Sequence, residues 1–134
     1  MSMSGTELVR SYYGSLAPGK RLNLHEILDP GVVIELQAGF PGARPRYEGL
    51  KQYLVDFLEL IYGSVEMEFL PEEFLEVGTR VVATGRMKGR SVSSGVPFDI
   101  PFVHLWTSNG RQLTHARLFT DTAILSDAIA GRRA

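Results

Sequence analysis

The chain has 134 residues, of which 44% are hydrophobic and 22% are charged, as is usual for a globular domain with a core of its own. Its formal net charge is −1, which gives no electrostatic basis for binding nucleic acid or an anionic membrane. The sequence contains no cysteine, which excludes disulfides, thiolate catalysis and zinc–thiolate sites. No signal peptide and no apolar run of about 20 residues is evident, so we expect one cytoplasmic domain over residues 1–134.

Three helical segments are predicted in the first half of the chain. Ser4 and Glu7 have the spacing of a capping box, and apolar residues follow at helical spacing as far as Pro18-Gly19. A second, short helix is expected over residues 23–28. The third helix is the clearest, because apolar residues recur every three or four positions over residues 50–61, as in a helix with one buried face.

Strands are predicted to dominate the rest of the chain. Residues 32–36 are mostly β-branched and apolar, and after Gly63 the pattern changes to the alternation of a half-buried strand. Further strand segments are expected in FLEV, RVVATGRMKG and PFDIPFVHLW. The Asn109-Gly110 pair then predicts a hairpin that joins FVHLW to LTHARLF, and residues 122–134 complete the chain as a short helix or tail. This order predicts an α+β fold, with helices covering one face of a curved antiparallel sheet.

The stretch HARLFTDTAIL, residues 115–125, carries the main candidate chemistry. Because alternate side chains of a strand point to opposite faces, His115, Arg117, Phe119 and Asp121 are expected to share one face, under the helices. Buried ionisable groups are costly unless they are paired, and the spacing makes Arg117 the natural partner of Asp121. Two interpretations of Asp121 remain open: a carboxylate inside a pocket, or a cap for the helix that follows.

Two further sets of side chains have alternative interpretations. His104 alternates with four apolar residues, Phe98, Ile100, Phe102 and Trp106. It is either a core histidine with one satisfied nitrogen or a proton shuttle. Tyr12 and Tyr13 are neighbours on the first helix, so one is expected to enter the pocket and the other to pack on the sheet. His104, His115 and Asp121 are side chains of the kind that ligate metals, but their spacing alone does not indicate a site and no metal is expected.

Several segments resemble one family. Three segments are similar to the nuclear transport factor 2-like superfamily, in its SnoaL-like and ketosteroid-isomerase-like branch. They are ELVRSYYGSL, YEGLKQYLVDFL and FVHLWTSNGRQLTHARLFTDTAIL. The resemblance implies a cystatin-like conical α+β barrel, with three N-terminal helices packed on the curved sheet. It also implies one deep pocket, no cofactor, and a homodimer formed through the outer sheet surface. The superfamily includes cyclases, isomerases, hydrolases and binding modules, so the fold alone does not choose among them.

The resemblance also assigns roles to individual residues. Tyr12 matches the tyrosine that donates to the substrate oxyanion in ketosteroid isomerases. The two carboxylates of those isomerases fall near Leu36 and Phe102, so steroid isomerisation is not expected. Asp121 and His104 match, by position, the acid/base aspartate and the assisting histidine of SnoaL-like cyclases.

Three functions remain open from the sequence. The first is a cofactor-independent cyclase, isomerase or hydrolase for an apolar, carbonyl-bearing molecule, with Asp121 as acid/base, His104 or His115 assisting, and Arg117 setting protonation. The second is a protein that binds a small apolar ligand without converting it, and the third is a dimerising domain whose own aromatic residues fill the cavity. The expected pocket residues are Tyr12, Tyr13, Phe57, Phe102, Trp106, His115 and Phe119.

A homodimer with two-fold symmetry is also predicted. Val103, Leu105 and Leu118 are expected to leave an apolar surface on the outer face of the sheet, and the helices can cover only the other face. Exposed apolar surfaces of this kind usually mark an interface between proteins.

Overall fold

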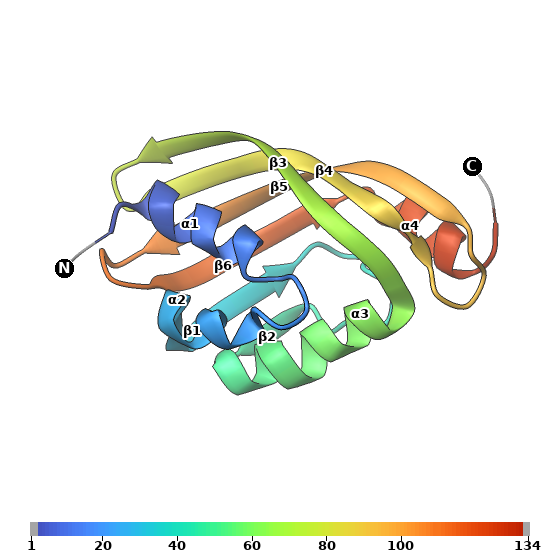
Figure 1. The fold of residues 1–134 in the computed structure, drawn as a ribbon, viewed down its shortest axis with the longest axis horizontal. Coiled ribbons are helices and arrows are strands. Elements are labelled where there is room, and N and C mark those ends of the chain that lie inside the picture. Colours follow the sequence, from blue (N-terminus) through green and yellow to red (C-terminus); the bar gives the residue numbers. More distant parts are fainter. Residues whose placement is uncertain (1–2, 133–134) are drawn as a thin grey trace.

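Six strands form one curved sheet, and helices lie along its concave side and at one end (Figure 1). The computed structural model describes residues 3–132. The strands are β1 (Leu28–Leu36), β2 (Arg46–Glu48), β3 (Val65–Val77), β4 (Arg80–Ser91), β5 (Pro97–Ser108) and β6 (Leu113–Thr120). The α-helices are α1 (Gly5–Gly14), α2 (Leu24–Ile27), α3 (Glu59–Ser64) and α4 (Thr122–Ile129). A 3₁₀ turn, η1 (Arg21–Asn23), precedes α2, and a π-helical segment, η2 (Gln52–Leu58), precedes α3.

The strands lie in the order β2-β1-β6-β5-β4-β3. The pairs of neighbouring strands are antiparallel, except that β1 and β6 run parallel, with Val33 opposite His115 and Leu36 opposite Leu118. A parallel pair needs a long connection, which β2, η2, α3 and the strands β3 to β5 provide here. The predicted α+β fold is confirmed. The expectation of a wholly antiparallel sheet is wrong at this one pair.

Helix α1 is fixed at its first turn by two sets of hydrogen bonds. The predicted capping box is present: the Glu7 amide donates to Ser4 Oγ (3.1 Å), and the Ser4 amide donates to Glu7 Oε1 (2.9 Å). Glu76, near the end of β3, accepts hydrogen bonds from the amide and the hydroxyl of Thr6, both at 2.7 Å. These contacts attach α1 to β3 and orient the face of the helix that carries Tyr12 and Tyr13.

The third predicted helix is present, but most of it has π geometry. Tyr53, Phe57, Leu58 and Ile61 are buried, as the apolar spacing predicted. A π-helical stretch is rare, and such stretches are frequently found at functional sites. Among the described residues, no helix combines the length and the apolarity that crossing a membrane requires.

A bulge in β3 lets the edge of the sheet curve over the helices. The register between β3 and β4 shifts between Pro71 and Glu73, as expected from a proline that cannot donate to the ladder. Gly85 lies opposite Pro71, and a Cβ at this position would collide with the carbonyl oxygen of Leu70. A side chain at Gly85 would therefore oppose the bend that encloses the concave side.

The concave face of β5 carries the centre of the core. Its side chains alternate as predicted, with Phe98, Ile100, Phe102, His104 and Trp106 buried. Between them, Val103 is 43% exposed on the outer face. Because His104 is in register with Leu118, and Trp106 with Ala116, the concave face of β6 carries Ala116, Leu118 and Thr120.

Candidate functional site: an aromatic cavity

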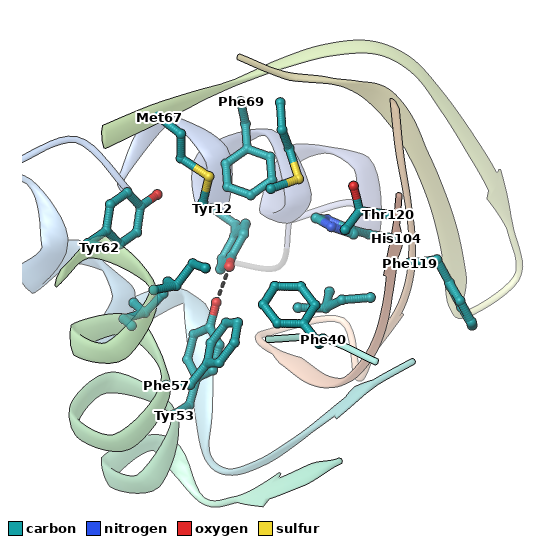
Figure 2. A pocket seen from close by; sticks show the side chains of 14 residues that line it. Tyr12, Phe40, Tyr53, Phe57, Tyr62, Met67, Phe69, His104, Phe119 and Thr120 are labelled. Atoms are coloured by element: carbon teal, nitrogen blue, oxygen red, sulfur yellow. Dashed lines mark hydrogen bonds between the residues drawn. The ribbon is translucent and has the colours of Figure 1, made fainter. Parts of the chain in front are cut away.

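A narrow cavity lies between the concave face of the sheet and the helices (Figure 2). Its wall is made of side chains from α1, the loop after β1, η2, α3 and strands β3 to β6. Aromatic and methionine side chains form most of the wall, with Tyr12, Phe40 and Phe57 among them. The cavity volume is about 20 Å³, which is room for about one water molecule.

Two tyrosine hydroxyls meet inside the cavity. Tyr12 comes from α1 and Tyr53 from η2, and their hydroxyl groups are hydrogen-bonded to each other, as Figure 2 shows. Burial raises the pKa of both side chains, so both are neutral phenols. The hydrogen bond between Tyr12 and Tyr53 uses one of their two hydroxyl protons. Because neither hydroxyl has a further partner among the described residues, the other hydroxyl proton is available to a ligand.

A second set of hydrogen bonds lies behind the wall, between α1 and β5. The indole Nε1–H of Trp106 donates to the hydroxyl oxygen of Tyr13 (3.3 Å), and that oxygen lies 2.6 Å from Nδ1 of His104. The ring of His104 also contacts Phe102, with 4.5 Å between the ring centres. Burial lowers the pKa of His104 to about 3, so the imidazole is neutral at physiological pH.

The cavity wall contains no ionised side chain in the part of the chain that the structure describes. The polar groups on it are the hydroxyls of Tyr12, Tyr53, Tyr62 and Thr120 and the imidazole of His104. Residues 3–132 also contain no cluster of three or more His, Asp or Glu side chains that could hold a metal ion. The cavity can therefore offer neutral hydrogen-bond donors in an apolar setting, without a carboxylate to act as a base.

The face predicted for His115, Arg117 and Phe119 is wrong, because these side chains leave the sheet on its outer side. His115 Nε2 lies 2.6 Å from a carboxylate oxygen of Glu35 on β1. Arg117 is exposed, and its guanidinium lies 5.4 Å from the ring centre of Phe119. Phe119 reaches only the rim of the cavity, and Figure 2 shows its ring directed away from it.

Leu118 is also on the opposite face from the one predicted, since it is buried on the cavity side. Of the three residues expected on the apolar outer surface, Val103 and Leu105 remain there, and the partly exposed Phe119 of β6 pairs with Val103 on the same face. The homodimer stays a prediction.

Asp121 caps helix α4 and does not line the cavity. Its Oδ1 accepts a hydrogen bond from the amide of Ile124 at 3.0 Å, which is the capping alternative left open by the sequence. Arg117 forms no ion pair with Asp121. Asp121 is therefore not the buried pocket aspartate that was predicted. Strand β6 ends at Thr120, and the carboxylate of the next residue turns towards the first amides of α4.

The other predicted pocket residues divide into two layers. The cavity is lined by Tyr12, Phe57 and His104. A second layer behind His104 consists of Tyr13, Phe102 and Trp106, which contact the His104 ring or each other. Sequence reasoning missed Tyr53, although the apolar pattern of residues 50–61 placed it on the buried face of a helix. A hydroxyl on an otherwise apolar face was the available signal.

The chain matches no family profile and no curated protein in sequence. Its structure is similar to an NTF2-like protein of unknown function from Burkholderia pseudomallei, with a TM-score of 0.85, 24% identity, and coverage of 95% of this chain and 98% of that one. It is also similar to a proposed SnoaL-like polyketide cyclase from Jannaschia sp. CCS1 (TM-score 0.83, 24% identity, 96% and 93% coverage). A third similar structure is TerC, co-crystallized with polyporic acid (TM-score 0.84, 23% identity, 94% and 98% coverage).

These likenesses establish an α+β fold of the cystatin-like kind. Within that class, the chain has the fold of the NTF2-like proteins, as the sequence resemblance implied. At such low sequence identity the likeness concerns the fold and not the activity.

Proposed function

We propose that the protein binds a small, mainly aromatic molecule through a carbonyl oxygen in the Tyr12–Tyr53–His104 cavity. The observation that carries the proposal is the composition of the wall: aromatic and methionine side chains, neutral hydrogen-bond donors and no ionised group. An ionised ligand would lose its hydration there without gaining an opposite charge, whereas a carbonyl oxygen would gain hydrogen bonds.

The fold likeness supports a small-molecule occupant. TerC, which has the same fold, was co-crystallized with polyporic acid. In this chain, most of the cavity wall comes from the same helices and strands that determine the fold, so the binding position would be held largely by the core. Sites on rigid elements keep their donors oriented before the ligand arrives.

Entry of a ligand requires the cavity to widen, and Phe40 is the side chain best situated to allow this. It is half-buried on the loop between β1 and β2, and its ring centre lies 5.6 Å from that of Phe57. Gly39 and Gly42, on either side, have φ angles of 89° and 71°, which glycine adopts without strain. Displacement of Phe40 would add the volume of a ring to the cavity.

A SnoaL-like cyclase or isomerase is the second candidate function. It is favoured by the Tyr12–Tyr53 pair, because a hydroxyl donor in an apolar site stabilises negative charge that develops on a carbonyl oxygen. Asp121 is not the base in this candidate function, since its carboxylate caps α4. A substrate with a strongly acidic C–H would be required.

The methionine methyl groups allow a direct test of binding. Met67 and Met87 line the cavity, whereas Met3 is exposed outside it. The protein, labelled at the methionine methyls, is titrated with 1-tetralone, an aromatic ketone, while its NMR spectrum is followed. We expect saturable shifts of the Met67 and Met87 signals and none of the Met3 signal. Unchanged cavity methionines at the solubility limit of the ketone would overturn the proposal.

A further inference from the structure

We infer that Tyr13 and Trp106 are positioning residues that hold His104 as the Nε2–H tautomer and so make its imidazole a hydrogen-bond donor towards the cavity. The ligand part of this inference rests on the proposed function, whereas the tautomer itself can be measured without any ligand. The inference follows from the direction of the hydrogen bonds, from the surroundings of Nε2 and from the packing of the ring.

The direction of the hydrogen bonds is set by Trp106. An indole nitrogen can only donate, so the hydroxyl oxygen of Tyr13 accepts from it. Tyr13 has one hydroxyl proton, and its other partner is Nδ1 of His104. If Nδ1 donated instead, the Tyr13 proton would have no acceptor among the described residues, which is costly for a buried hydroxyl. The hydroxyl therefore donates to Nδ1.

The tautomer follows from this direction. A neutral imidazole carries one proton, and because Nδ1 accepts, that proton is on Nε2. Nε2 has no hydrogen-bond partner within residues 3–132. Every fully enclosed side-chain nitrogen or oxygen in this range does have a partner, so Nε2 is not fully enclosed. Since His104 lines the cavity, its Nε2–H is open to the cavity side.

Packing prevents the ring from turning over. Tyr13 stacks on the imidazole with an angle of 20° between the planes, and Phe69 and Phe102 contact it from other directions. A rotation that exchanged the two nitrogens would break the 2.6 Å hydrogen bond and displace these rings. The Nε2–H group is thus held in one orientation before a ligand binds.

This arrangement defines the chemical class of the ligand at that point of the wall. A ketone or quinone oxygen would accept from Nε2–H, whereas a ligand N–H or O–H group would meet another donor. The site is therefore expected to prefer an aromatic ketone to the same ring system without the oxygen. 1-Tetralone and tetralin are such a pair, because they differ only in that a carbonyl group of the ketone replaces one ring methylene.

The first experiment measures the tautomer by ¹⁵N NMR of the histidine side chains in the full chain. The His104 signals are identified by their loss in His104→Gln. We expect His104 to be protonated on Nε2 and not on Nδ1 over about pH 5–8. Tyr13→Phe removes the donor to Nδ1 and is expected to give a mixture of tautomers. Tyr62→Phe is the matched control, because it removes a hydroxyl that lies at the cavity without contacting His104, and it should leave the pattern unchanged.

The second experiment compares binding of the two probes. In the wild type, 1-tetralone is expected to bind more tightly than tetralin, and Tyr13→Phe should reduce this preference by about 3- to 10-fold, as for the loss of one oriented hydrogen bond. Tyr62→Phe should reduce it less. A loss of affinity that is equal for both probes would indicate a purely structural effect and would overturn the ligand part of the inference.

The outcomes separate the inference from the proposed function. A wild-type His104 protonated on Nδ1, or a Tyr13→Phe spectrum identical to that of the wild type, overturns the positioning role. If Tyr13→Phe does not fold, the wild-type spectrum still decides the tautomer. If neither probe binds, the proposed function and the ligand preference fail, while the tautomer measurement still decides the positioning role.

Discussion

His104 and His115 lie on neighbouring strands but on opposite faces of the sheet, and their surroundings have nothing in common. His104, on β5, is surrounded by aromatic rings, and its hydrogen-bonding partner is a tyrosine hydroxyl. His115, on β6, is half-exposed beside a carboxylate. The comparison shows that the same side chain lies among aromatic rings or beside charged groups according to the face on which the strand places it.

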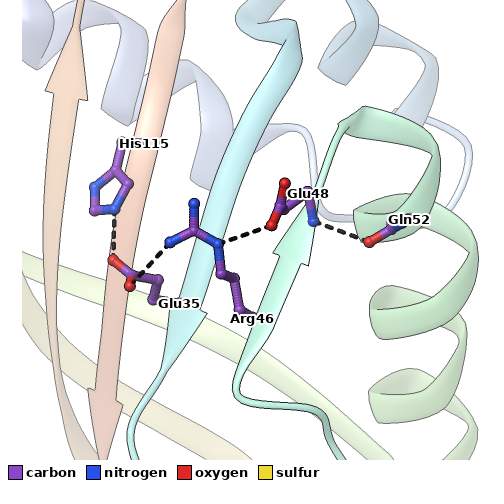
Figure 3. Close-up of polar contacts among 5 residues, drawn as sticks. All are labelled: Glu35, Arg46, Glu48, Gln52 and His115. Carbon is purple, nitrogen blue, oxygen red and sulfur yellow. Dashed lines mark hydrogen bonds and ion pairs between the residues drawn. The ribbon is translucent and has the colours of Figure 1, made fainter.

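The outer face around His115 carries a row of alternating charges (Figure 3). Glu35 accepts from His115, Arg46 reaches Glu35 at 3.4 Å and Glu48 at 3.1 Å, and the Glu48 amide donates to Gln52 at 2.9 Å. The hydrogen bond from His115 lowers the pKa of Glu35. Exposed pairs of this kind contribute little to stability, so the concave face should dominate the energetics.

The largest effect is expected from Trp106→Ala. The indole is fully buried, so its removal leaves a large cavity and takes a donor from Tyr13. We expect the free energy of unfolding to fall by about 3–5 kcal/mol. Val103→Ala, on the outer face of the same strand, is the control and should cost less than about 1 kcal/mol. Chemical denaturation measures both, and equal losses would contradict the difference between the faces.

The second effect concerns pH. Because the pKa of His104 is about 3 in the folded protein and 6.5 ordinarily, the unfolded chain binds a proton between these values that the folded chain does not. Stability therefore rises with pH through this window, by about 1.4 kcal/mol per pH unit from this one group. Denaturation of the wild type and of His104→Gln between about pH 4.5 and 7 should show a steeper dependence in the wild type. Parallel curves would contradict a buried neutral imidazole.

A smaller effect is expected at Asp121. Asp121→Ala removes the cap of α4 and should destabilise the protein by about 1 kcal/mol, whereas Asp121→Asn keeps a capping oxygen and should be nearly neutral. Neither change should alter binding of 1-tetralone. If the protein proves to be an enzyme and Asp121→Asn lowers its activity by about 100- to 10,000-fold with the fold intact, the carboxylate is an acid/base group after all.

The smallest effect is expected at Glu35. Glu35→Gln should cost less than about 1 kcal/mol at neutral pH, because solvent screens the exposed pairs. Since the folded-state pKa of Glu35 is lowered, this contribution is present above its ordinary pKa of 4.5 and is lost as the pH falls below that value. Thermal unfolding of both proteins in low and high salt measures the difference, which should shrink in high salt. A loss as large as that in Trp106→Ala would reverse our ranking of the two faces.

Local patterns in the sequence predicted the elements well. The capping box at Ser4, the apolar spacing of residues 50–61 and the Asn109-Gly110 turn each involve residues close together in the chain, and each is present in the structure. The alternation on β5 was equally clear, because from Phe98 to Trp106 its concave face is apolar apart from His104.

The orientation of β6 could not be predicted in the same way. Its two faces carry similar apolar content, with Phe119 on one and Leu118 on the other, so alternation alone does not choose between them. The choice is made by register with β5, where His104 pairs with Leu118. The meeting of Tyr12 with Tyr53 likewise depends on how α1 and η2 pack, and no local pattern encodes it.

The parallel pairing of β1 with β6 has a consequence for how the chain folds. Glu35 and His115 are 80 positions apart, so closing this contact costs more chain entropy than forming the hairpins between β3 and β6. During synthesis, β1 leaves the ribosome long before its partner strand exists. We therefore expect the meander of β3 to β6 to form first and β1, with β2, to dock last. Folding should accordingly be slower than the length of the chain alone would suggest.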